Sequence, residues 1–208
     1  MTAVSAEATL SRGALTRQTI LQHAAGLASQ LGLEGLTIGR LAEDLGLSKS
    51  GLFAHFQSKE ALQLQLLDFA AARFVEAVVK PTLAAPRGEA RIRAAFEHWL
   101  EWPKKSSLPG GCFFVAASIE LDDRPGPVRD KLVRLQRDWL DTLAGVVRTA
   151  VAEGDFRGDV DPEQFAHDLY GIMLAGHHAA RLLRDPKAGA RTRAGFDALV
   201  ARARPTRA

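Results

Sequence analysis

The sequence contains little cysteine and no long apolar run, and each scarcity excludes a class of protein. Cys112 is the single cysteine among 208 residues, which excludes an internal disulfide framework and is typical of a reducing compartment. No segment approaches the run of about 18 uncharged apolar residues that a membrane span requires. Residues 1–17 lack the apolar centre of a secretory signal. We therefore expect a soluble cytoplasmic protein with no membrane partner.

A strong excess of one charge is also missing. Lys and Arg number 27 and Asp and Glu 24, which gives a net charge of +3. The positive excess lies in residues 181–208, whereas residues 1–60 contain as many acidic as basic side chains. The overall charge therefore indicates only weak, nonspecific affinity for polyanions.

Alternating runs of Val, Ile and Thr, which would predict strands, are scarce, and good helix formers dominate. In 16–32, apolar residues recur at helical spacing, and Gly32 follows them as a stop signal. The same reasoning predicts helices over 37–46, 48–56, 59–79, 89–102, 111–121, 127–153, 162–184 and 187–203. Pro103 is expected to end one helix, and the Pro and Gly residues of 80–88 indicate a linker. The sequence thus predicts an all-α fold of about nine helices.

Residues 37–57 have the features of a helix-turn-helix. Gly46 suits a left-handed turn between two short helices, and Ser48 is a good N-cap for the second helix. Leu47 and Leu52 would fill the corner between the helices. This geometry places the first residues of the second helix in a DNA major groove. A tight helical hairpin without a role in DNA binding is the alternative interpretation.

These motifs resemble the DNA-binding headpiece of the tetracycline-repressor (TetR) family of transcription regulators. The resemblance covers about 45 residues from Ile20 to Leu62 and rests on residues 37–38, 41–48, 51–56 and 58–62. It implies a three-helix headpiece over 1–60 and a ligand-binding and dimerisation domain over 61–208. By the resemblance, phosphate contacts would come from Thr37, Phe53, His55 and Lys59, and base contacts from Ser48, Lys49, Ser50 and Gly51.

Two positions of the reading helix depart from the family pattern. The family commonly has Tyr where this chain has Phe53, so one hydrogen bond to a phosphate is in doubt. Ser50 stands where glycine is frequent, which adds a hydroxyl group. Because residues 1–60 offer few cations, a single headpiece is expected to bind DNA weakly.

The last two long helices offer a surface for dimerisation. Residues 162–184 combine an apolar face with small residues, and Gly176 and Ala180 are spaced i, i+4. In the family these helices pair with their symmetry mates as a four-helix bundle, so we expect Gly176 and Ala180 to face a second copy. The alternative is that both helices close a core within one chain.

Aromatic residues and a histidine in the body are candidates for an effector pocket, although buried aromatic residues more often form ordinary core. We assign Trp99, Trp102, Phe113, Phe114, Tyr170 and His177 to this pocket. The prediction is a homodimeric repressor, preferred over an activator, that binds a palindromic double-stranded operator and is released by a small molecule.

An all-helical enzyme or small-molecule carrier is the competing hypothesis. His98 and Glu101 at i, i+3 could hold a metal ion with His177, although a solvated surface pair is the simpler interpretation. Cys112 lies at an expected helix N-terminus, where a thiolate would be favoured. The simpler interpretation is that Cys112 is a small, buried residue of the core. Because no nucleophile elbow or phosphate-binding glycine motif occurs, we expect no enzymatic activity, no cofactor and no metal.

Overall fold

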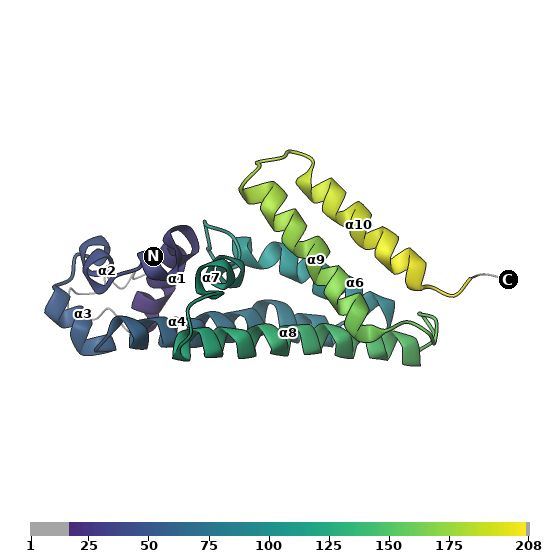
Figure 1. Cartoon of the computed structure of the whole chain (residues 1–208), viewed down its shortest axis with the longest axis horizontal. Coiled ribbons are helices and arrows are strands. Elements are labelled where there is room, and N and C mark those ends of the chain that lie inside the picture. The colour runs from purple at the N-terminus through teal and green to yellow at the C-terminus, as the bar shows by residue number, and fades with distance from the viewer. Residues whose placement is uncertain (1–16, 207–208) are drawn as a thin grey trace, which may run out of the picture.

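The computed structural model describes residues 17–206, and this range contains helices and connecting segments without a strand. The helices, drawn in Figure 1, are α1 (Arg17–Gly35), α2 (Ile38–Leu45), α3 (Lys49–Phe56), α4 (Lys59–Phe74), the π-helical η1 (Val75–Val79), α5 (Lys80–Ala84), α6 (Glu89–Lys105), α7 (Phe113–Leu121), α8 (Pro127–Ala152), α9 (Pro162–Arg181) and α10 (Ala188–Ala203). The predicted all-α fold is confirmed.

The molecule is elongated, with its two parts at opposite ends. Figure 1 shows α1, α2 and α3 as a headpiece at one end, and α9 and α10 inclined across the other end. The long α4 and α8 run side by side beneath both parts and contact each other. The C-terminal end of α10 therefore lies far from the headpiece. Arg202 and Arg204, at this end of α10, thus lie away from the helix-turn-helix.

α4, η1 and α5 form one uninterrupted helical run, which corrects the predicted linker over 80–88. Helical structure continues through Pro81 to Ala84. In η1 the backbone N–H of Lys80 donates to the carbonyl of Val75, five residues earlier. In a regular α-helix, the ring of a proline clashes with the carbonyl four residues earlier. The wider π-turn moves that carbonyl away from the ring, so the helix can continue. Counted as one helix, this run brings the described residues to nine helices.

Pro103 lies inside α6 and does not end it, contrary to the sequence prediction. The helix continues to Lys105, and the backbone N–H of Ser106 donates to the carbonyl of Trp102 at 2.9 Å. A proline near the end of a helix removes only one backbone hydrogen bond, and packing of the buried Trp99 and Trp102 on this face compensates for it.

The headpiece is attached to the body through the end of α1. The predicted stop at Gly32 is a kink with a φ of 79°, after which helical structure resumes up to Gly35. Beyond the kink, the side-chain amide of Gln63 on α4 donates to the carbonyl of Leu33 at 3.0 Å. On the other side, the backbone N–H of Gly110 donates to the Ser29 hydroxyl at 2.9 Å. The headpiece is therefore fixed to both α4 and the segment before α7.

Candidate DNA-binding and effector sites

The helix-turn-helix is built by two local caps and a left-handed glycine. The hydroxyl of Thr37 accepts from the backbone N–H of Arg40, and that of Ser48 accepts from Gly51, each at 3.1 Å. Gly46 has a φ of 63° and ends α2, a conformation that a Cβ disfavours. Since the caps fix both helix starts, the sequence alone determines where α3 begins.

Buried leucine and phenylalanine side chains hold α3 against the headpiece and leave its other face free. Leu52 and Phe56 are fully buried, as is Leu41 of α2. The remaining residues of α3 are exposed: Lys49, Ser50, Gly51, Phe53, Ala54 and His55. All the candidates that the sequence assigned to α3 therefore lie on its solvent face.

Phe53 is 54% exposed, so its ring projects into solvent. The side chain of Lys49 packs against Gly39 of α2, where an added Cβ would lie 3.3 Å from the Cε of Lys49. The serine hydroxyls of Ser48 and Ser50 are 3.3 Å apart. A phenyl ring, an ammonium group and two hydroxyls thus occupy the exposed surface of one short helix.

Lys59 occupies a different environment from the other DNA-binding candidates. Its ammonium group donates to the backbone carbonyl of Glu34 at 2.8 Å and to the carboxylate of the same residue at 3.0 Å. The Lys59 ammonium group, with the Gln63 amide, lowers the pKa of the Glu34 carboxyl group. The charge of Lys59 is already paired in this arrangement, and its contact with DNA stays a prediction.

Two cations that the sequence reasoning did not assign lie beside the reading helix. Arg17 donates to the backbone carbonyl of His55 at 2.8 Å, and its guanidinium group lies 5.8 Å from the ring centre of Phe56. Arg40 is exposed in the first turn of α2 and lies 3.4 Å from Asp44. Their place in the first turns of α1 and α2 is visible in the sequence, but their approach to α3 depends on how the three helices pack.

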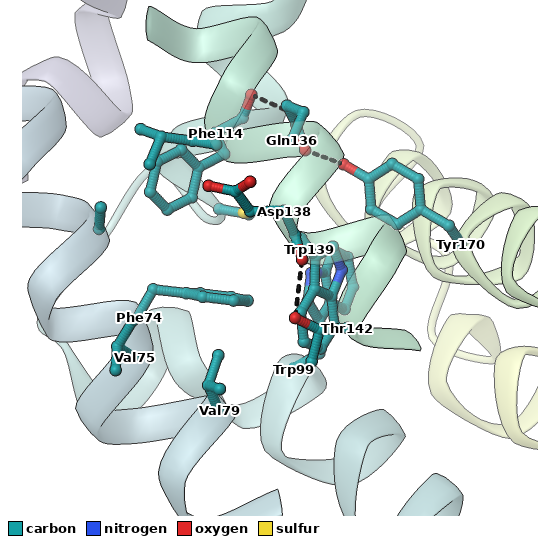
Figure 2. A pocket seen from close by; sticks show the side chains of 13 residues that line it. Phe74, Val75, Val79, Trp99, Phe114, Gln136, Asp138, Trp139, Thr142 and Tyr170 are labelled. Atoms are coloured by element: carbon teal, nitrogen blue, oxygen red, sulfur yellow. Dashed lines mark hydrogen bonds between the residues drawn. The ribbon is translucent and has the colours of Figure 1, made fainter. Parts of the chain in front are cut away.

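The body contains an apolar cavity of about 160 Å³ that is partly open to solvent, shown in Figure 2. Phe74 and Trp139 meet there edge to face, with ring centres 5.0 Å apart. The lining comes from five parts of the chain and consists of Ala71, Phe74, Val75, Val79, Trp99, Cys112, Phe114, Leu135, Gln136, Asp138, Trp139, Thr142 and Tyr170. Trp99, Phe114 and Tyr170 of the predicted pocket are among these residues.

Some polar groups of the cavity lining bond to one another (Figure 2), whereas the buried Nε1 of Trp139 has no hydrogen-bond partner among the described residues. The Tyr170 hydroxyl donates to the Gln136 side-chain carbonyl at 3.0 Å, and the Thr142 hydroxyl donates to the Asp138 backbone carbonyl at 2.7 Å. Burial raises the pKa of Tyr170 to about 12. Burial also raises the pKa of the Cys112 thiol, which accepts a hydrogen bond from the Trp102 indole at 3.4 Å. Both groups are therefore neutral at pH 7.

Three predicted pocket residues do not line this cavity. Trp102 and Phe113 are each 1% exposed and belong to the surrounding core. His177 lies in a separate groove of about 310 Å³ that shares Trp99 with the cavity. Its Nε2 accepts from the backbone N–H of Cys112 at 3.2 Å, and burial lowers the pKa of its imidazole. This geometry makes His177 a link between α9 and the start of α7.

The acidic side chains of α6 are engaged in ion pairs. Glu97 accepts two hydrogen bonds from Arg193 of α10, at 2.7 and 3.0 Å. Glu101 lies 2.6 Å from Lys105. Within residues 17–206, no group of three or more His, Cys, Asp and Glu side chains is arranged to hold a metal ion. The geometry thus gives the metal hypothesis for His98, Glu101 and His177 no support.

The assignment of Gly176 to a surface between two copies is wrong. A Cβ on Gly176 would lie 2.4 Å from the Thr192 hydroxyl of α10 in the same chain. Ala180 lines the His177 groove between α6 and α9. Sequence spacing identified Gly176 correctly as a point of close helix approach, but the approaching helix is α10 of the same chain. Ala180 is exposed, so its contact with a second copy stays a prediction.

A different face of α9 and α10 points outward. The α9 residues on this face are exposed and recur with helical spacing. The residues that α10 contributes to this face are all alanines. The set is Gly171, Ala175 and His178 of α9, Leu182 directly after it, and Ala190, Ala194, Ala198 and Ala201 of α10, and we call it the outer face. Leu182 is 70% exposed there.

No helix in the described range is long and apolar enough to cross a membrane.

The fold and these sites define a class of protein, the helix-turn-helix regulators with a helical body. A family model described as "Tetracyclin repressor-like, C-terminal domain" matches residues 88–196, and a model of "Bacterial regulatory proteins, tetR family" matches residues 20–66. The first match alone spans more than half of the chain. The protein belongs to the TetR family of DNA-binding transcription regulators.

Individual relatives agree with this assignment. The transcriptional repressor AcnR of Corynebacterium diphtheriae is 35% identical over 86 residues, which are 41% of this chain and 45% of AcnR. The chain thus matches less than half the length of that relative. A TetR-family regulator from Cytophaga hutchinsonii has the same fold, with a TM-score of 0.77 and 17% identity over 91% of this chain and 96% of that chain. AibR, solved with isovaleryl coenzyme A and operator DNA, has a TM-score of 0.70 and 22% identity over 91% of this chain and 98% of AibR.

Proposed function

We propose that this protein is a transcriptional repressor that binds a palindromic operator as a homodimer and releases it when a small molecule fills the aromatic cavity. The observation that carries the proposal is one helical run, α4 to α5, which begins in the headpiece and contributes Phe74, Val75 and Val79 to the cavity. AcnR is named a repressor, and AibR binds both operator DNA and a small molecule. Both relatives support the proposal.

In the proposed complex, the first turn of α3 enters the major groove. Ser48, Lys49 and Ser50 contact base edges, with the main chain of Gly51 close to the groove. Thr37, Phe53, His55 and Lys59 lie towards the phosphates, and Arg17 and Arg40 add charge at the two sides. This arrangement uses the exposed face of α3 and the two cations beside it.

The charge of the headpiece makes dimerisation necessary for useful affinity. Few cations reach the phosphates from one headpiece, so two headpieces about 34–36 Å apart are needed to contact successive turns of DNA. We assign the contact between the two copies to the outer face of α9 and α10. Its small side chains allow two helix pairs to approach closely, as in four-helix packing.

Occupation of the cavity would be transmitted along two routes to the headpiece. α4 and η1 carry cavity residues at one end and begin next to α3 at the other. α7 carries Phe114 in the cavity and Glu120, whose carboxylate contacts the end of α1. A ligand that binds better to one spacing of the headpieces shifts the dimer population towards that spacing. This mechanism needs no chemical reaction, and we place the protein in the cytoplasm with its DNA.

A gel-shift experiment with the full chain and DNA from its own promoter region tests the proposal. We expect a discrete complex that survives excess nonspecific DNA and contains two chains. A Lys49→Ala variant should weaken the complex, and a variant with Lys104→Ala, a charge change in the body, should not. The absence of any competitor-resistant complex, on this DNA and on duplexes selected from a random pool, would contradict the proposed function.

A further inference from the structure

The charge distribution around the cavity restricts the chemistry of its effector. Among the described residues that line it, Asp138 is the only one with a formal charge at pH 7. The other titratable lining groups, Cys112 and Tyr170, are neutral, and the described lining contains no Lys, Arg or His. An anionic ligand would therefore enter without a cation to neutralise it, and burial of an unpaired charge is costly.

Asp138 is available to a ligand because no other group holds it. Its residue is exposed, and none of the ion pairs in the described part of the chain includes it. Figure 2 shows its carboxylate projecting towards the side of the cavity where Phe74 and Phe114 lie. An unpaired carboxylate beside aromatic rings is an arrangement that attracts cations.

The aromatic rings of the lining also favour a cationic ligand. Five aromatic side chains line the cavity: Phe74, Trp99, Phe114, Trp139 and Tyr170. The face of an aromatic ring carries negative charge and attracts an ammonium group within about 6 Å of its centre. Size gives the second restriction, because about 160 Å³ is close to the volume of roughly 150 Å³ that holds a benzene molecule in an engineered apolar cavity.

We infer that the effector is a compact aromatic cation, an arylalkyl amine of about one ring, whose ring enters the cavity and whose ammonium group stays beside Asp138. This inference rests on the proposed function, which makes the cavity the effector site. The same chemistry disfavours organic acids, whose carboxylates would meet Asp138 and the faces of the rings.

Three probes of one size separate charge from shape. Isothermal titration of the full chain at pH 7 with benzylamine, benzyl alcohol and benzoate compares a cation, a neutral molecule and an anion. We expect benzylamine to bind about tenfold more tightly than benzyl alcohol, and benzoate to bind most weakly, because carboxylate and rings act together on the cation. Benzoate binding as tightly as benzylamine, or no binding of benzylamine, would overturn the inference.

A matched pair of variants tests the role of Asp138. Asp138→Asn removes the charge without changing the shape, and we expect it to reduce benzylamine binding about fivefold while benzyl alcohol is unaffected. Asp141→Asn makes the same charge change at an exposed position of α8 outside the lining, and it should leave all three affinities unchanged. Equal effects of the two substitutions would show that general charge, and not this site, selects the cation.

The outcome for the inference and the outcome for the proposed function are read from separate measurements. Titration without DNA tests the effector class alone. If the probes bind in the expected order but leave the operator complex intact, the cavity selects aromatic cations as inferred and ligand-induced release, which belongs to the proposed function, is wrong. If the chain binds operator DNA and the probes show no charge preference, the regulator is confirmed and the effector class is overturned.

Discussion

Glu120 of α7 accepts a hydrogen bond from the backbone N–H of Leu33 in α1, with 2.6 Å between Oε2 and the nitrogen. The contact depends on Gly32, since a Cβ there would lie 1.8 Å from the Oε1 of the same carboxylate. The body therefore grips the headpiece at the kink of α1. Because α7 also carries Phe114 into the cavity, this hydrogen bond is a direct structural connection between the two sites.

Replacing Gly32 should break this connection. Gly32→Ala places a Cβ against Glu120 and forces a left-handed conformation on an alanine, and we expect a loss of about 2–4 kcal/mol in the free energy of unfolding. Gly154→Ala is the matched control, because Gly154 has nearly the same φ, 80°, with open space around it. It should lose about 1–2 kcal/mol. Urea denaturation of both variants measures the difference, and equal losses would mean that Glu120 simply moves aside.

Lys49 tests the assignment of the reading helix. Its ammonium group lies on the exposed face of α3, so Lys49→Ala should weaken binding to operator DNA by about 1–3 kcal/mol without changing the thermal stability. Fluorescence anisotropy with labelled operator measures the affinity. An affinity equal to that of the unchanged protein would place base recognition elsewhere.

Phe53 offers a gain of function. Since its ring is exposed, a hydroxyl added by Phe53→Tyr can reach solvent or a phosphate, and we expect DNA binding to strengthen by about 0.5–1.5 kcal/mol. Titrations at several salt concentrations check whether the extra contact is to the backbone, which would add slightly to the salt dependence. The prediction fails if affinity is unchanged at every salt concentration.

The outer face of α9 and α10 is tested by Ala175→Arg. In a dimer this substitution buries unpaired charges against the second copy, so we expect a folded monomer near 22.5 kDa in sedimentation. Operator binding should be largely lost with the dimer. Ile119→Arg on the exposed surface of α7 is the control and should remain dimeric. A dimeric Ala175→Arg variant would place the contact on another surface.

His177 makes the stability of the body depend on pH. Its pKa is lowered in the folded state, so the unfolded chain binds the proton more readily, and stability is greatest above the ordinary pKa of about 6.5. As pH falls below that value, protonation of the unfolded chain removes this contribution. Urea denaturation at pH 7.5 and pH 5.5 should therefore show a loss that is smaller in His177→Gln than in the exposed neighbour variant His178→Gln. Identical pH dependence in both variants would exclude His177 as the source.

Local signals explain which parts of the molecule were predictable from sequence. The start of α3 is set by Ser48 and the left-handed Gly46, which act within a few residues, so the helix-turn-helix and its exposed candidates could be located. Gly32 was recognisable as an interruption of α1 for the same reason. Pro81 was misleading because a single π-turn, which no local pattern announces, lets the helix continue.

The cavity and the outer face depend on rotations of whole helices. Trp99 and Trp102 are three residues apart on α6, yet one lines the cavity and the other lies in the core. His177 looked like a pocket residue, but the packing of α9 turned it towards the backbone of Cys112. Gly176 was recognised as a position of close helix approach, and the approaching helix belongs to its own chain. Such directions follow from tertiary packing and not from spacing.

The central claim is sequence-specific binding of a dimer to a palindrome, and equilibrium anisotropy on two duplexes tests it most directly. One duplex carries the palindrome selected by the full chain, and the other carries the same bases in scrambled order at the same salt concentration. The account predicts two chains per palindromic duplex and binding at least about 1,000-fold tighter than to the scrambled one. Equal affinity for the two duplexes would contradict it.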